Sequence, residues 1–151
     1  MPNELIIIVT LFAFGYFFGT WAEKKHYASI MEREKAFIHL PAVTAKTVNI
    51  DESDIEMATM VYGSAVISID YFKQVLALFR NLIGGSIASY ETLMDRARRE
   101  AMLRMKEMAS DAAIIVNVRL ETSTIGKNTN QKNNVGCVEV LAYGTALKLK
   151  R

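Results

Sequence analysis

The sequence predicts an α+β protein in which an N-terminal transmembrane helix precedes a small domain with the element order strand, two helices, two strands. Three observations support this fold class. Residues 5–22 carry no charged side chain. Two segments, 71–83 and 86–111, place apolar residues at helical spacing. Three segments are rich in β-branched or alternating apolar residues, as strands are: 60–70, 112–124 and 135–150.

The uncharged stretch 5–22 would extend roughly 27 Å as a helix, close to the thickness of a bilayer's hydrocarbon core. A cleaved signal peptide is the competing interpretation, but the chain starts with "MPNE", which lacks lysine and arginine. We therefore favour a retained single-pass anchor. Lys24 and Lys25 follow the span, so the positive-inside rule places the N-terminus outside and the C-terminal domain in the cytoplasm.

The chain divides into an anchor (1–22), a juxtamembrane helix with a connector (23–58) and a folded domain (59–151). Within the anchor, Gly15 and Gly19 form a G-x-x-x-G pair, a pattern that permits close contact between helices and also arises by chance.

Composition excludes several classes of function. The 18 basic and 16 acidic residues nearly balance, which gives no reason to expect nucleic acid as a partner. Cys137 is the only cysteine, and the two histidines precede the domain. A nucleophile therefore has no histidine base beside it in the domain, and we expect neither an enzyme nor a bound cofactor.

Two motifs are candidate sites. Gly84, Gly85 and Ser86 precede a helix, where an anion could bind, but the lysine of a phosphate-binding loop is missing. A joint between two helices is the favoured interpretation, with a weak anion site as the alternative. Met102, Met105 and Met108 could offer thioethers to copper(I), although methionine more often fills a core or an interface between subunits.

A three-stranded sheet with helices on one face leaves its other face uncovered, and such faces are usually covered by other chains. We therefore expect a homo-oligomer. Its symmetry should be cyclic, because a membrane anchor makes every copy face the same way.

The domain resembles the YbjQ-like family of small bacterial proteins, which have a double glycine, a tyrosine followed by an acid, an "A-R-x-x-A" helix, an "A-D-A" strand entry and a terminal "G-T-A". The resemblance covers roughly residues 60–151 and implies a dodecin-like fold, a ring of five subunits and a heavy-metal-binding label. Ser110 stands where the family usually has glycine. The matching residues outside the glycine pair include Tyr90, Glu91, Arg98, Asp111, Gly144 and Thr145.

The expected function is that of a scaffold or accessory component in a larger assembly of the bacterial inner membrane, without catalytic activity. Its expected partners are the lipid bilayer, further copies of the chain and other proteins of that assembly. The alternative is an oligomeric, membrane-tethered sensor of a ligand or heavy metal. The polar segment 123–135 is predicted to be an exposed loop.

Overall fold

The computed structural model describes residues 2–68, 88–125 and 137–150. These form a small α+β domain with a three-stranded sheet and, among the described residues, two α-helices. The predicted helix at 71–83 lies outside the described residues. The elements are α1 (Pro2–Ala36), a 3₁₀ turn (Glu52–Asp54), β1 (Ile55–Ser68), α3 (Ala88–Met108), β2 (Ile114–Ile125) and β3 (Cys137–Leu149).

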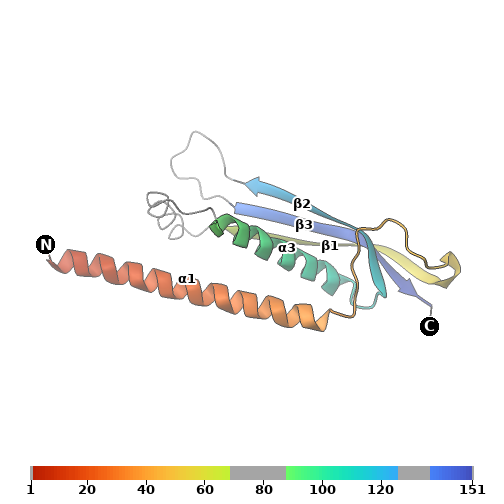
Figure 1. Ribbon diagram of the computed structural model, residues 1–151, viewed down its shortest axis with the longest axis horizontal. Coiled ribbons are helices and arrows are strands. Elements are labelled where there is room, and N and C mark those ends of the chain that lie inside the picture. Colours follow the sequence, from red (N-terminus) through yellow and green to blue (C-terminus); the bar gives the residue numbers. More distant parts are fainter. Residues whose placement is uncertain (1, 69–87, 126–136, 151) are drawn as a thin grey trace.

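Helix α1 is a single 35-residue rod that joins the predicted anchor to the predicted juxtamembrane helix without a break. Its C-terminal half lies beside α3, and its N-terminal half extends away from the sheet (Figure 1). No helix long and apolar enough to cross a membrane was found among the described residues. The side chains of residues 5, 8, 9 and 12, within the predicted span, lie outside that description.

The sheet has the order β1-β3-β2, and both pairs of neighbouring strands are antiparallel. The three-stranded sheet expected from the sequence is therefore present, with the last strand in its centre. The first strand begins at Ile55, before the predicted domain boundary at residue 59.

The connector before β1 is part of this sheet's edge. The Val43 N–H donates a hydrogen bond to the Ile115 carbonyl (2.9 Å), and the Ile115 N–H donates one to the Pro41 carbonyl (2.9 Å). The Asn117 N–H donates a hydrogen bond to the Ala45 carbonyl at 2.8 Å. Unpaired strand edges invite association with other chains, so this segment protects part of β2. The sequence hides the pairing because an irregular segment beside Pro41 has no strand periodicity.

A β-bulge distorts β2 where it faces Gly144. Val116 pairs with Thr145 and Arg119 with Tyr143, so two residues of β2 oppose the single Gly144. One of the two, Asn117, has a φ of 53°, in the left-handed region that asparagine tolerates better than most residues. A Cβ at Gly144 would lie 3.0 Å from the Val116 carbonyl oxygen, which explains the need for glycine there.

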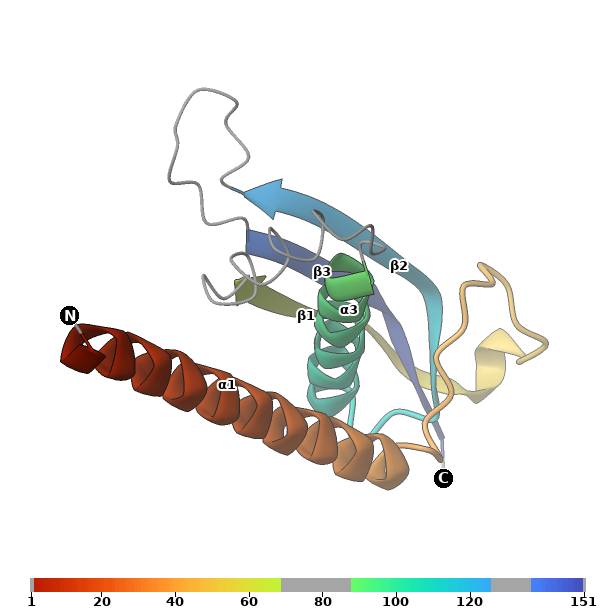
Figure 2. The same ribbon diagram turned by 60° about the vertical axis from the view of Figure 1, so that its left-hand side comes forward.

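The core lies between α3 and the inner face of the sheet, as Figure 2 shows. Three residues of the predicted apolar stripe on α3, Ala97, Ala101 and Met105, are fully buried. They meet Val61 and Ala65 of β1, together with the inward residues of β3. The closest approach is at Gly63, where an added Cβ would overlap the backbone of Ala101 and Met105 and lie 2.8 Å from the Cβ of Arg104.

Candidate functional site

Several predicted site residues cannot be placed. Gly84, Gly85 and Ser86 lie outside the described residues, so the choice between a helix joint and an anion site stays a prediction. Tyr90 and Glu91 belong to the first turn of α3, but their side chains are outside the description. In the anchor, Gly15 is exposed and Gly19 has open space where a side chain would stand.

The three methionines of α3 lie in three different environments. Met105 is fully buried in the core, Met108 is exposed, and Met102 is half-buried at a groove. Met105 therefore fits the core interpretation of this motif. Among the described residues, no group of three or more histidines, cysteines or acids could hold a metal ion.

The four remaining residues of the family motif are also dispersed. Asp111 follows α3 and lies 3.6 Å from the Lys148 ammonium. Gly144 faces the bulge in β2, and Thr145 is next to it in β3, opposite Met60. Arg98 lies on the exposed side of α3, at the same groove as Met102. The motif therefore does not form one cluster in the described structure.

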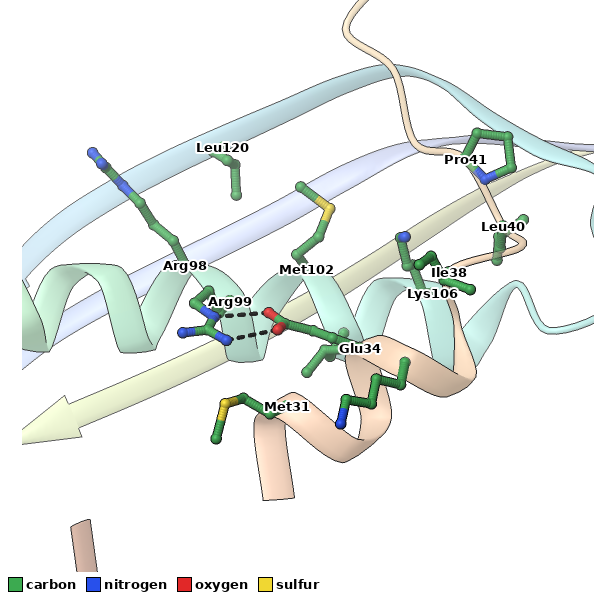
Figure 3. A pocket seen from close by; sticks show the side chains of 12 residues that line it. Met31, Glu34, Ile38, Leu40, Pro41, Arg98, Arg99, Met102, Lys106 and Leu120 are labelled. Atoms are coloured by element: carbon green, nitrogen blue, oxygen red, sulfur yellow. Dashed lines mark hydrogen bonds and ion pairs between the residues drawn. The ribbon is translucent and has the colours of Figure 1, made fainter. Parts of the chain in front are cut away.

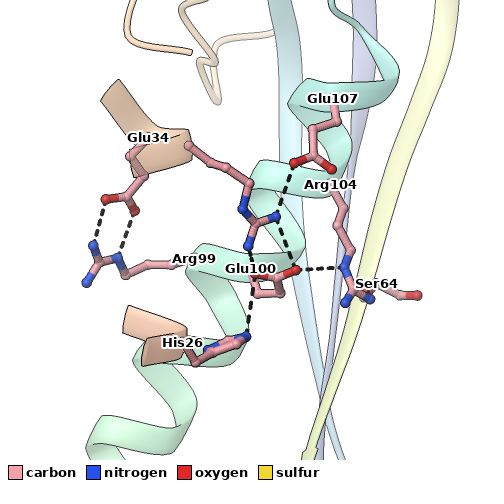
Figure 4. Close-up of polar contacts among 8 residues, drawn as sticks. His26, Glu34, Ser64, Arg99, Glu100, Arg104 and Glu107 are labelled. Atoms are coloured by element: carbon pink, nitrogen blue, oxygen red, sulfur yellow. Dashed lines mark hydrogen bonds and ion pairs between the residues drawn. The ribbon is translucent and has the colours of Figure 1, made fainter. Parts of the chain in front are cut away.

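The densest polar cluster joins α1 to α3 and is centred on Glu100, which is only 5% exposed (Figure 4). Both its oxygens accept hydrogen bonds from the Arg33 guanidinium of α1. The Arg104 Nε donates to Glu100 at 2.9 Å, and the His26 Nε2 is 3.8 Å away. Arg33 also reaches the Glu107 carboxylate at 3.1 Å. Glu100 therefore holds charged groups from both helices together.

A second pair reinforces the same helix interface. Arg99 of α3 binds Glu34 of α1 through two parallel hydrogen bonds of 2.7 and 2.6 Å. Paired bonds of this kind fix orientation as well as supplying charge attraction. The Arg99 guanidinium also lies over the ring of Tyr27, 5.8 Å from its centroid.

The pKa values of both carboxyl groups follow from these contacts. Burial alone would raise the pKa of Glu100, but hydrogen bonds from Arg33 and Arg104 outweigh it and lower that pKa below the ordinary value. The hydrogen bond from Arg99 lowers the pKa of Glu34. Both groups are therefore held as carboxylates, which suits a permanent attachment of α1 to α3 better than proton transfer.

Glu100 and Arg104 are four residues apart, a spacing that from the sequence alone is typical of a charge pair on a solvated helix face. That pair is present, but α1 covers Glu100, so the surface interpretation is wrong for this residue. The only signal of this contact in the sequence is complementary charge. Arg33 of α1 is opposite in sign to Glu100 of α3, and Glu34 of α1 is opposite in sign to Arg99 of α3.

A groove of about 610 Å³ lies at the end of this interface, between α1, the connector, α3 and β2 (Figure 3). Its volume falls within the range of small-molecule pockets, roughly 300–1,000 Å³. Sequence reasoning missed it because its walls come from segments far apart in the chain. The apolar walls are formed by Met31, Ile38, Leu40, Met102, Leu103 and Leu120.

The face of the sheet opposite α3 carries exposed apolar side chains, and we call it the outer sheet face. Along β1, Met60, Tyr62 and Val66 are each more than half exposed. Tyr62 pairs with Tyr143, and Ser64 with the exposed Leu141, so the central strand continues the apolar surface. No described helix or strand covers this face (Figures 1 and 2).

The N-terminal half of α1 is a second exposed apolar surface. At 100° per residue, its exposed large side chains other than Tyr16 fall within an arc of about 140°. On the same side of the helix, the exposed residues beyond Trp21 are mainly polar, beginning with Lys24 and Lys25. The exposed apolar side chains of this surface include Ile6, Ile7, Leu11, Phe14, Phe17, Phe18 and Trp21.

Comparisons with known proteins match most of the chain. The YbjQ_1 family model, described as "Putative heavy-metal-binding", matches residues 42–150, a range that begins beyond α1. A UPF0145 protein of Pyrococcus furiosus is 37% identical over 99 residues, covering 64% of this chain and 80% of the relative. A UPF0145 protein of Natronomonas pharaonis is 35% identical over 115 residues, covering 74% of this chain and 100% of the relative.

Among solved structures, the chain is similar to a protein of unknown function from the DUF74 family of Pediococcus pentosaceus. The match covers 74% of this chain and 98% of that chain, with a TM-score of 0.47 and 13% identity.

Proposed function

The chain belongs to the YbjQ_1 family over residues 42–150, and from this premise we propose that it is a membrane-anchored subunit of a homo-oligomeric ring. The ring acts as a scaffold or accessory component of a larger assembly in the bacterial inner membrane and has no catalytic activity. The observation that carries the proposal is the uncovered outer sheet face. An exposed apolar surface of this kind on a folded domain usually marks an interface.

The outer sheet face is suited to contact with another copy of the chain. Tyrosine and methionine are enriched at protein interfaces, and this face carries Met60, Tyr62 and Tyr143. Identical subunits that share one membrane form cyclic assemblies, since each copy has the same orientation relative to the bilayer. Five subunits is the number expected from the family resemblance.

Lipid is the proposed environment of the N-terminal half of α1. Its apolar surface changes to a charged one near Trp21, where the Lys25 ammonium lies 5.4 Å from the centre of the indole ring. Tryptophan and lysine commonly mark the boundary between lipid and water. The open side of Gly19 leaves room for a neighbouring helix, in keeping with the G-x-x-x-G pair formed with Gly15.

The alternative function is a tethered sensor of a ligand or metal, and the groove beside Met102 is the feature that favours it. The description of the family as heavy-metal-binding favours the metal version. Titration of the full chain with zinc and copper(I) separates the two functions, because tight, stoichiometric uptake supports the sensor and absence of uptake supports the scaffold.

Two lysines on the outer sheet face should prevent assembly. We expect the double variant Tyr62→Lys/Val66→Lys to run as a single subunit in mild detergent, because charged groups would be buried without partners at the interface. Size-exclusion chromatography with light scattering measures this. Met108→Lys is the matched control, since Met108 on α3 is 52% exposed and Val66 is 59% exposed. Unchanged assembly of the double variant would contradict the proposed interface.

The proposed membrane attachment of α1 leads to a separate prediction about how the chain fractionates with membranes. We expect the wild-type chain to stay in the membrane pellet after an alkaline carbonate wash. Leu11→Lys/Phe18→Lys should be released, because each lysine in the hydrocarbon region costs roughly 3 kcal/mol. Met31→Lys, further along the same helix, should stay in the pellet. Release of the wild-type chain would rule out a membrane-embedded α1.

A further inference from the structure

The groove beside the α1–α3 interface combines apolar walls with an excess of positive charge. From this combination we infer that it binds a free single-chain amphiphile with a carboxylate head, such as a medium-chain fatty acid. Every group of the groove lies within one chain, so the inference does not depend on the proposed ring; the choice of a free amphiphile over a bilayer lipid rests on the proposed membrane anchor.

The apolar part of the groove is open enough to receive an alkyl chain. Leu40 and Leu103 form a buried base, at 1% and 2% exposure. Ile38 at the rim is 83% exposed, and Met31 and Leu120 are also exposed. A bound chain would cover these rim residues, and each buried methylene would contribute about 0.8 kcal/mol.

The charged part of the groove has three cations, Lys35, Arg98 and Lys106, that form no hydrogen bond or ion pair with an acid among the described residues, although Lys106 acts on Glu34 at longer range. Glu34 is the single acid of the lining, and its two hydrogen bonds go to Arg99. Lys106 donates only to the Phe37 carbonyl, at 3.3 Å. Neither Lys35 nor Arg98, which also line the groove, forms a hydrogen bond or ion pair with a described side chain. A carboxylate would therefore meet an excess of positive charge, since four cations and one acid line the groove.

The sequence spacing on α3 aligns two of the cations with a groove methionine along one face of the helix. Arg98, Met102 and Lys106 are four residues apart, so they share one face of the helix over about 12 Å. Figure 3 shows Met102 between the two cations, with Leu120 on the neighbouring strand. A carboxylate at either cation thus has an apolar path beside Met102 for its chain.

A free amphiphile fits better than a bilayer lipid. The groove residue Glu34 is thirteen positions beyond Trp21 on the continuous helix α1, which corresponds to about 20 Å along its axis. A phospholipid that remains in a bilayer bounded near Trp21 would not bring its head group to Arg98 or Lys106.

The test is photolabelling of the full chain in phosphatidylcholine nanodiscs with decanoate that carries a diazirine at its chain end. Peptide mass spectrometry should place the label near Ile38 or Met102, and unlabelled decanoate should compete. We expect Arg98→Met/Lys106→Met to reduce this labelling about tenfold, since hydrogen bonds to charged groups are removed. The control variant Lys24→Met/Arg119→Met removes two exposed cations elsewhere and should label like the wild type.

Arg98→Met alone removes no hydrogen bond or ion pair among the described residues, so it reports on the groove even if Lys106→Met disturbs folding. It should reduce labelling about threefold. Equal labelling of this variant, or equal labelling by an alkylammonium analogue, would overturn the inference. Label confined to residues 6–21 would also overturn it, because the decanoate would then lie in the bilayer beside α1 and not in the groove. Label that reaches the groove only in the non-assembling Tyr62→Lys/Val66→Lys variant would identify a second copy as the occupant and would also overturn it.

Discussion

Gly63→Ala is expected to lower the free energy of unfolding by about 3 kcal/mol, at the upper end of the usual cost of overpacking a core. The added methyl would overlap the backbone of Ala101 and Met105 in α3. Backbone atoms of a packed helix cannot move aside individually, so α3 must retreat from β1. The contacts of Ala97, Ala101 and Met105 with the sheet would then loosen together.

Urea unfolding of the full chain in mild detergent, followed by circular dichroism, measures this loss. Ser110→Ala is the control, because Ser110 is exposed in the turn after α3. This substitution adds no atom to the core, so the control should unfold like the wild type. Equal stability of the Gly63→Ala and wild-type chains would show that α3 does not lie this close to β1.

Glu100→Gln is expected to cost about 2 kcal/mol of unfolding free energy. Removing one member of a buried ion pair typically costs 3–5 kcal/mol. Here the figure is reduced because the side chains of Arg33 and Arg104 are 29% and 52% exposed and water screens part of their charge. The loss should appear as detachment of α1 from α3, detected as faster hydrogen exchange in residues 23–36.

The same substitution should weaken the acid dependence of stability. The pKa of Glu100 is lower in the folded chain than in the unfolded one, so its stabilising contribution is complete above the unfolded value of about 4.3. The contribution is lost as the pH falls through the lower folded value. The wild type should therefore lose stability below about pH 4.3, and Glu100→Gln should lose less.

The pKa of Glu34 is also lowered in the folded chain, so Glu34 also stabilises the fold less as the pH falls. Some acid dependence of stability should therefore persist in the Glu100→Gln variant. Glu121→Gln is the control, because Glu121 is an exposed carboxylate on β2. An acid dependence that is unchanged by Glu100→Gln would mean that Glu100 is not ionised and paired in the folded chain.

The sequence predicts local elements well because their signals are local. Buried positions alternate in β1 and β3, and Ala97, Ala101 and Met105 recur at helical spacing on α3. The edge pairing of Val43 and the early start of β1 escape prediction, because single backbone bonds and polar strand ends have no periodicity. The boundary predicted at residue 59 consequently separates segments that are hydrogen-bonded to the same sheet.

The candidate site is less predictable than the fold, because it depends on contacts between distant segments. Glu100 resembles any exposed helix residue until α1 covers it, and the sequence does not specify that contact. The groove requires Ile38, Met102 and Leu120 to come together from three elements. The uncovered outer sheet face is different: a three-stranded sheet with its helices on one side implies such a face, and the exposed Tyr62 and Val66 agree with it.

The central claim, that the outer sheet face is covered by further copies of the chain, is tested most directly by native mass spectrometry of the full chain released from mild detergent. Each chain has a mass of 16.9 kDa. The predicted result is a discrete particle of several chains, five on the family resemblance, at micromolar protein concentration. A single 16.9 kDa species under the same conditions, with folded circular dichroism, would contradict the claim.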